Sequence, residues 1–165
     1  MKASRKIRSI ALTGVGIATA LSFSVAPAEA NTSISAQLQM YKTATVSGAN
    51  VQVKLPMSRY DAQGYINNGA RIEVTCYGDD EYFDNQLFPT RVFNGTKPTT
   101  PTLLNYLWAD DAGVHLFAAI EFPIGAEFNE DVFPDNGDEI YCKARWIDGD
   151  GASISAFTNV AKGTF

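Results

Sequence analysis

Apolar and polar residues alternate along most of the chain that follows residue 32. Between Ser33 and Met40 the even-numbered positions are apolar, and the odd-numbered positions are serine or glutamine. Because successive side chains of a strand point to opposite faces, this period of two predicts strands with one buried face. No stretch after the first thirty residues repeats with a helical period between caps, so we expect an all-β domain. The other alternating segments are 51–55, 71–76, 114–122, 139–146 and 154–160.

Residues that favour tight turns separate these segments, and two of the turns predict hairpins. The segment 97–101 contains two prolines and predicts an extended loop, because proline cannot donate a ladder hydrogen bond. The expected hairpins join 103–109 to 114–122 through Asp110–Gly113, and 139–147 to 152–160 through Asp148–Gly151.

The first thirty residues have the pattern of an export signal. Four basic residues lie within the first eight positions, and an uncharged, largely apolar run of 16 residues follows from Ile10 to Val25. That run is shorter than the roughly 20 residues of a membrane-spanning helix. The small residues Ala28 and Ala30 match the pattern that signal peptidase cleaves. We therefore expect a short, bacterial-type signal peptide over residues 1–30 and one secreted domain over 31–165, with no membrane association after cleavage.

Cys76 and Cys142 are the two cysteines of the chain. Export exposes them to oxidising conditions, in which a pair of cysteines normally forms a disulfide. Both lie on the apolar phase of their segments, so we expect both thiols to point into the core. A bridge of this length would restrict the unfolded chain by roughly 4 kcal/mol in the loop-entropy model. The alternative, a catalytic or metal-binding thiol, requires an exposed and electropositive environment.

About eight short strands and a disulfide between core positions predict a two-sheet antiparallel β-sandwich with one inter-strand disulfide. The segment Asp138–Cys142 is similar to the late cysteine strand of immunoglobulin domains, so the architecture resembles an immunoglobulin-like sandwich. That fold has a tyrosine two residues before this cysteine, whereas Ile140 lies there in this chain. Its core tryptophan follows the first cysteine closely, whereas Trp108 comes 32 residues after Cys76. The resemblance therefore concerns architecture only, and the strand order stays open.

The acidic composition restricts the partners. The full chain carries 13 Lys and Arg against 18 Asp and Glu, a net charge of −5. Removal of residues 1–30 takes away four basic residues and one acidic residue, so the net charge of the remaining domain is −8. Such a domain repels nucleic-acid phosphates and anionic membrane surfaces. No glycine-rich phosphate loop follows a strand, so no nucleotide cofactor is expected.

Few residues are candidates for catalysis. His115, the single histidine, lies on the polar phase of its segment, where a surface or half-buried strand residue is the usual alternative to a general base. Glu73 and Glu121 are mid-strand carboxylates that a glycoside hydrolase would place across a cleft, and the alternative for both is a solvated outer face. A zinc enzyme is not expected, because one histidine and two paired cysteines do not supply enough ligands. No serine lies in a nucleophile elbow.

The turn Asp148–Gly151 has an Asp-x-Asp-Gly form that can supply oxygen ligands to calcium. The calcium loop of an EF-hand starting there would end in a glutamate, but Asn159 occupies that position. A looser site would combine this turn with Asp135, Asp138 or Glu139. The alternative is two acidic turns without an ion, and no metal or other cofactor is assigned.

Two segments, 79–91 and 127–134, combine acidic and aromatic residues. Exposed aromatic side chains among polar groups are typical of sites that bind carbohydrates or proteins. The alternative is that these rings fill the core from irregular connections. If the two segments meet at one end of the sandwich, they form a single site. The candidate ligand-binding residues are Tyr82, Phe83, Phe88, Arg91, Phe128 and Phe133.

These observations predict a secreted, non-enzymatic binding module. Its partner would be an extracellular protein, for example a secreted hydrolase that it inhibits, or a polysaccharide. Two other classes stay open: a small secreted hydrolase that uses carboxylates, and a surface-assembly protein whose first strand, 33–41, pairs with a neighbouring molecule. The oligomeric state is not predicted.

Overall fold

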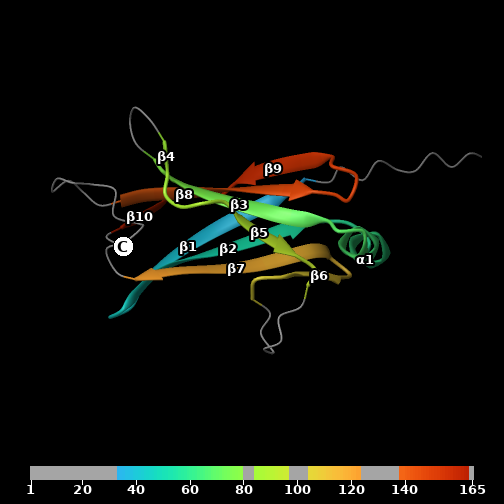
Figure 1. Cartoon of the computed structure of the whole chain (residues 1–165), viewed down its shortest axis with the longest axis horizontal. Coiled ribbons are helices and arrows are strands. Elements are labelled where there is room, and N and C mark those ends of the chain that lie inside the picture. The colour runs from blue at the N-terminus through green and yellow to red at the C-terminus, as the bar shows by residue number, and fades with distance from the viewer. Residues whose placement is uncertain (1–32, 80–83, 97–103, 124–137, 164–165) are drawn as a thin grey trace, which may run out of the picture.

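The structure is a computed structural model that describes residues 33–79, 84–96, 104–123 and 138–163. Two antiparallel sheets pack together, with a helix at one end (Figure 1). Strands make up 61% of the structure, which confirms the predicted all-β sandwich. In chain order the elements are β1 (Ser35–Lys42), β2 (Val46–Leu55), α1 (Arg59–Asn67), β3 (Arg71–Gly78), β4 (Asn85–Gln86), β5 (Arg91–Asn94), β6 (Leu107–Asp110), β7 (Gly113–Pro123), β8 (Asp138–Ile147), β9 (Ser153–Phe157) and β10 (Ala161–Gly163).

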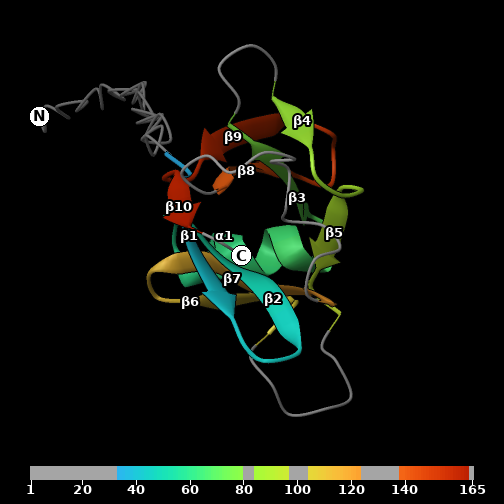
Figure 2. The ribbon, with the colours of Figure 1, turned by 90° about the vertical axis from the view of Figure 1, so that its left-hand side faces the viewer.

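The strands form two layers, which are seen end-on in Figure 2. Sheet A has the order β1-β2-β7-β6, and sheet B has the order β10-β8-β3-β4. β5 also pairs with β3, and β9 also pairs with β8, so β3 and β8 form the centre of sheet B. At the centre of sheet A, β2 and β7 pair from Val46 opposite Pro123 to Leu55 opposite Val114.

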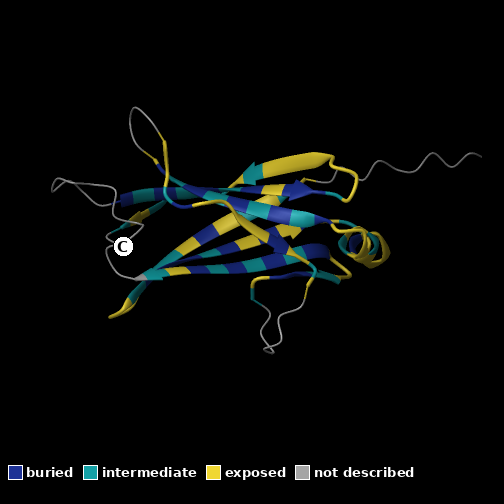
Figure 3. Ribbon diagram, viewed as in Figure 1, coloured by how far each residue is buried: buried dark blue, intermediate teal, exposed yellow. Residues whose placement is uncertain are grey.

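The core lies between the two sheets and follows the predicted period of two. In β3 the buried residues Ile72, Val74 and Cys76 alternate with partly exposed neighbours, and the same banding runs along β2, β7 and β8 (Figure 3). Burial of one Val, Leu or Ile side chain stabilises a fold by about 1.5–3 kcal/mol relative to exposure. Apolar positions repeated on the inner faces of both sheets therefore hold the sandwich together.

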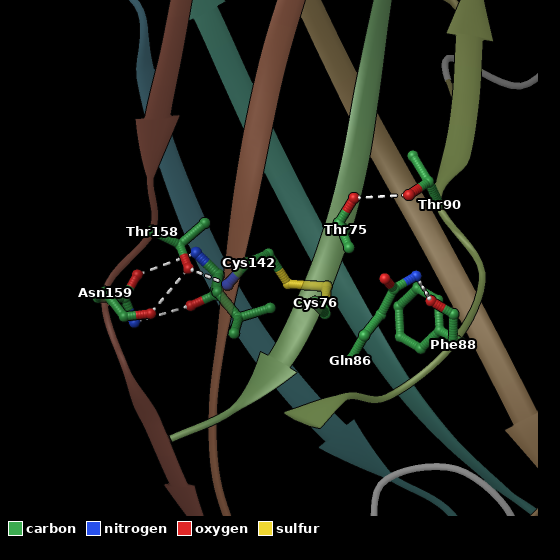
Figure 4. Close-up of a disulfide and its surroundings, with 9 residues drawn as sticks. Thr75, Cys76, Gln86, Phe88, Thr90, Cys142, Thr158 and Asn159 are labelled. Atoms are coloured by element: carbon green, nitrogen blue, oxygen red, sulfur yellow. Dashed lines mark hydrogen bonds between the residues drawn. A yellow bond between two sulfur atoms is a disulfide. The ribbon is translucent and has the colours of Figure 1, made fainter. Parts of the chain in front are cut away.

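The predicted disulfide between Cys76 and Cys142 is present, and both residues are fully buried (Figure 4). The two cysteines are opposite one another on β3 and β8, so the bridge links neighbours within sheet B. The backbone N–H of Cys142 donates to the Thr158 hydroxyl, and the carbonyl of Cys76 accepts from Leu87 N–H. The cysteines thus form a non-hydrogen-bonded pair, in which the side chains approach most closely. The bridge of an antibody domain instead links two sheets.

Helix α1 is a correction, because the sequence predicted no helix after the first thirty residues. Its N-cap is Ser58, whose hydroxyl oxygen accepts from the backbone N–H of Asp61 at 3.1 Å. Ala62 is its buried residue, and the helix packs against β6 and β7 at one end of the sandwich. The helix has nine residues and buries little of its surface, so its sequence contains no extended apolar repeat with a helical period. For this reason the alternation of apolar and polar residues could not predict it.

Both predicted hairpins are present among the described residues, with different ends. In the first, Asp110 of β6 lies opposite Gly113 of β7, and β6 starts at Leu107 rather than at 103. In the second, Ile147 of β8 lies opposite Ser153 of β9. The predicted loop at 97–101 lies outside the described residues.

The predicted strand 152–160 is interrupted, which is a second correction. β9 ends at Phe157 opposite Lys143, and β10 begins at Ala161 opposite Ile140. The chain therefore advances four residues from Phe157 to Ala161 while β8 advances three from Ile140 to Lys143. The one extra residue forms a β-bulge. The backbone of Thr158 still donates to the Cys142 carbonyl, while its side chain accepts from Cys142 N–H. The bulge follows from this replacement of a backbone acceptor by a hydroxyl.

Candidate functional site

The described residues include two of the six predicted ligand-binding residues. Phe88 is 3% exposed, and the centroid of its ring lies 5.0 Å from that of Phe122. Phe88 therefore fills the core, which is the alternative to a ligand-binding role. Arg91 is exposed, and its guanidinium lies 5.7 Å from the centroid of the Phe122 ring. The remaining four, Tyr82, Phe83, Phe128 and Phe133, lie outside the described residues.

The two mid-strand carboxylates do not form a catalytic pair. Glu73 of β3 points away from the core of sheet B, since its neighbours Ile72 and Val74 are buried. Glu121 of β7 points away from the core of sheet A, since its neighbour Ile120 is buried. The two side chains therefore lie on opposite outer faces of the sandwich and do not flank a common cleft.

The acidic turns cannot combine into one calcium site. The turn after β8 starts at Asp148, whereas Asp138 and Glu139 lie at the start of the same strand, nine residues from its end at Ile147. At about 3.3 Å per residue these groups are roughly 30 Å apart. One carboxylate oxygen of Asp148 accepts from the N–H groups of Asp150 and Ala152, which closes the turn. Asp135 lies outside the described residues, and no group of potential metal ligands occurs within them.

Sheet A carries a group of amide side chains on its outer face. The register of β1 and β2 places Gln37 opposite Gln52 and Gln39 opposite Asn50. Asn50 is partly exposed, and the other three are exposed. Within the described part of the chain, none of the four side chains makes a hydrogen bond. We call these four residues the amide face.

Tyr41 marks one end of the amide face. It lies two residues after Gln39 on β1, and its hydroxyl donates to Oε1 of Glu121 on β7 at 2.5 Å. The ring therefore crosses β2, and a Cβ atom at Gly48 would stand 2.3 Å from Cζ of Tyr41. Partial burial, and then the bond to the Glu121 carboxylate, raises the pKa of Tyr41 to about 12. Glycine at position 48 thus leaves the space that this fixed aromatic ring occupies.

Trp108 and His115 mark the other end of this surface. They are opposite one another on β6 and β7, and their rings stack with centroids 5.4 Å apart. Nε2 of His115 lies 2.8 Å from Oδ1 of Asp110. The backbone N–H of Ala112, and then His115, hold the pKa of the Asp110 carboxyl below its usual value.

His115 is half-buried on the outer face, as the polar phase of its segment predicts, with 18% of its side chain exposed. Its hydrogen-bond partner within the described residues is a carboxylate rather than a nucleophile. A second aromatic residue, Phe117, lies opposite Gln52 and is partly exposed. The amides are thus bordered by aromatic rings at both ends and along β7.

The outer face of sheet B has a different character, because its charges bind one another. Glu73 lies 3.3 Å from Nε of Arg71 and 3.7 Å from Nη1 of Arg145. Elsewhere on this face Lys162 pairs with Glu139. The amides of sheet A, in contrast, have no side-chain partner among the described residues.

The sequence contained the residues of the amide face but not their arrangement. The alternation identifies Gln37 and Gln39 only as the polar phase of the first strand, and it does not distinguish Tyr41 or Phe117 as site residues. Amides at consecutive outward positions of two strands are a usable signal. The register between β1, β2 and β7 decides whether they form one surface, and that register was not predicted.

Comparison with known proteins adds no function to this fold. The sequence matches no model of a known protein family, and no curated protein is significantly similar to it. None of the helical structure in the described residues is long and apolar enough to cross a membrane. The fold defines the chain as a two-sheet β-sandwich with a disulfide inside one sheet.

Proposed function

We propose that this protein is an exported, non-enzymatic binding module that recognises an uncharged polysaccharide through the outer face of sheet A. The amide face carries the proposal. Four neighbouring amides without hydrogen-bond partners in the described residues present both donors and acceptors. Sugar hydroxyl groups also donate and accept, so the two surfaces are complementary.

The aromatic rings around the amides support the same ligand class. Tyr41, Phe117 and Trp108 lie on the same outer face, and rings of this kind contribute large apolar contact area. The apolar C–H faces of sugar rings pack on such groups while the hydroxyls bind the amides. The basic N-terminus, the apolar run and the disulfide support export.

The proposal is non-enzymatic because the candidate catalytic groups are not assembled. Glu73 and Glu121 lie on opposite faces, and His115 bonds to Asp110. A protein partner is the alternative, as is a role in surface assembly through β1, whose register with β2 extends from Ser35 to Lys42.

The direct test is co-sedimentation of the exported, oxidised protein with insoluble cellulose, chitin, xylan and starch. We expect one of these polymers to retain the protein, and the double variant Gln37→Ala/Gln52→Ala to reduce the retained fraction at least fivefold. The control is Gln63→Ala, an exposed amide on α1 that bonds to Asn67 instead. Circular dichroism melting curves must show that the variants remain folded.

Two results would count against the proposal. Equal retention of the wild type and the Gln37→Ala/Gln52→Ala variant would place polysaccharide binding on another surface. No retention by any polymer, together with capture of one protein from the producing cells' culture supernatant by folded bait only, would favour a protein partner.

A further inference from the structure

A pocket opens between helix α1, the end of β2 and the hairpin that joins β8 to β9. Its volume is about 340 Å³, within the range of roughly 300–1,000 Å³ that small-molecule sites occupy. Figure 1 shows α1 and this hairpin at the same end of the sandwich. The lining residues that matter are Met57 after β2, Asp61 and Tyr65 on α1, and Trp146, Asp148 and Ile154 on the hairpin.

Two aromatic rings form much of the apolar wall. Tyr65 and Trp146 meet edge to face, with ring centroids 6.0 Å apart and an interplanar angle of 84°. Trp146 is 5% exposed, whereas Tyr65 and Ile154 are 41% and 38% exposed. Exposed apolar groups around a buried indole favour a ligand with an apolar body. Aromatic faces also attract cations.

Two carboxylates border the same pocket, one from each side. Asp61 accepts a hydrogen bond from the Ser58 hydroxyl at 2.6 Å. Oδ1 of Asp148 accepts hydrogen bonds from the two backbone N–H groups of its own turn. Neither forms an ion pair within the described residues, and Arg59, in the same turn of α1 as Asp61, does not pair with either. The pocket therefore combines an apolar wall with unneutralised negative charge.

The walls of the pocket are held together before any ligand binds. A Cβ atom at Gly149 would stand 2.3 Å from the carbonyl oxygen of Asn68, so the tip of the hairpin packs directly on the end of α1. The bonds to Asp148 fix the turn itself. A preorganised site loses less conformational entropy when it binds.

We propose that this pocket binds a small organic cation, an ammonium or guanidinium group on an apolar body. The charged group binds the carboxylates of Asp61 and Asp148, and the apolar body packs against Trp146 and Tyr65. Charge complementarity selects this occupant, because the chain has a net charge of −5 and attracts cations. The inference uses no residue of the amide face and does not depend on the proposed function.

The probe is 2-phenylethylammonium, and its neutral counterpart is 2-phenylethanol. The chain contains two tryptophans, so the ¹H–¹⁵N spectrum of the intact, oxidised protein contains two indole signals. The variant Trp108→Phe identifies the signal of Trp146 and leaves the pocket lining unchanged. We expect the ammonium compound to shift the Trp146 signal in a saturable manner, and the alcohol to bind at least tenfold more weakly.

Two charge-removing variants and one control test the carboxylates. Asp148→Asn keeps an oxygen that closes the turn, and Asp61→Asn keeps an acceptor for Ser58, so both retain the local structure. Each is expected to weaken binding of the ammonium compound at least fivefold. Asp79→Asn, at the far end of β3 from α1, removes one exposed charge and must leave the affinity within twofold.

Three outcomes would overturn the inference. The first is a Trp146 signal that does not move at any soluble concentration of the ammonium compound. The second is equal affinity for the alcohol and the ammonium compound, which would make the pocket apolar without charge recognition. The third is binding of a capped lysine tripeptide but not of the free amine, which would assign the pocket to a basic side chain of a protein partner.

Discussion

The side chain of Asn159 binds both backbone groups of Leu38, although Leu38 is in sheet A and Asn159 lies between two strands of sheet B. Oδ1 of Asn159 accepts from Leu38 N–H at 2.9 Å, and Nδ2 donates to the Leu38 carbonyl at 3.1 Å (Figure 4). The amide thereby imitates a neighbouring strand at the open edge of β1. The β-bulge between β9 and β10 places Asn159 there, so it joins the edge of sheet A to sheet B.

Asn159→Ala is expected to lower the free energy of unfolding by about 1–3 kcal/mol, because a partly buried N–H and carbonyl lose their partners. Urea unfolding measures this change, and hydrogen exchange at the Leu38 amide should accelerate. Asn159→Asp keeps the acceptor but directs a carboxylate toward the Leu38 carbonyl. This variant should be less stable than the wild type at neutral pH. Its stability should recover below about pH 4, where the protonated acid can donate to the Leu38 carbonyl. Equal stability of both variants and the wild type would contradict this role.

The disulfide should stabilise mainly through the unfolded chain. Cys76 and Cys142 are 66 positions apart, and their double replacement by alanine should lower the free energy of unfolding by roughly 4 kcal/mol. Both residues are fully buried, so a thiol reductant should act only on unfolded molecules. Alkylation and mass spectrometry with and without urea test this accessibility. Rapid reduction of the native protein would contradict it.

Gly113 and Gly151 form a matched pair for a test of backbone geometry. Both have positive φ, 124° and 92° respectively. A Cβ atom at Gly113 would stand 2.1 Å from the carbonyl oxygen of Leu55, whereas nothing lies within 4 Å of one at Gly151. Gly151→Ala should lower the free energy of unfolding by about 1–2 kcal/mol, from left-handed strain alone. Gly113→Ala should lower it by roughly 3–5 kcal/mol, because the backbone at Leu55 must also move to make room for the Cβ atom. Thermal unfolding of both variants measures the difference.

The strands and the disulfide could be predicted because every second residue is apolar from Ile72 to Cys76 in β3 and from Ile140 to Trp146 in β8, and both cysteines share that phase. Helix α1 could not, since Ala62 alone is buried on it. The bulge at Thr158 depends on one hydroxyl that replaces a backbone acceptor. The amide face depends on which strands are neighbours: Gln52 meets Phe117 only because β7 pairs with β2. Local alternation carries no information about such long-range pairing.

The Tyr41–Glu121 contact gives a prediction about pH. The pKa of Tyr41 is about 12 in the folded protein, against its ordinary value of 10. The folded state therefore holds this proton more tightly than the unfolded state. The stabilisation is complete below pH 10 and is lost as the pH rises from 10 to 12. Tyr141, whose pKa is raised to about 12 by burial and by Asp84, contributes in the same direction.

Spectrophotometric titration of tyrosinate in the wild type and in Tyr41→Phe isolates the ionisation of Tyr41. Glu121→Gln should lower the pKa of Tyr41 only in part, because burial is the larger cause. Gly48→Ala should lower the pKa of Tyr41 further toward 10, since the new Cβ would meet the far end of the Tyr41 side chain and displace the ring from the sheet while the fold remains. The control Tyr60→Phe removes the hydroxyl of a side chain that is 88% exposed, and it must leave the ionisation of Tyr41 near pH 12 unchanged. An unchanged Tyr41 titration in Gly48→Ala would show that the ring does not depend on the space above Gly48. If the ring does contribute to polysaccharide binding, the same Gly48→Ala variant should also be retained less by the polymer than the wild type.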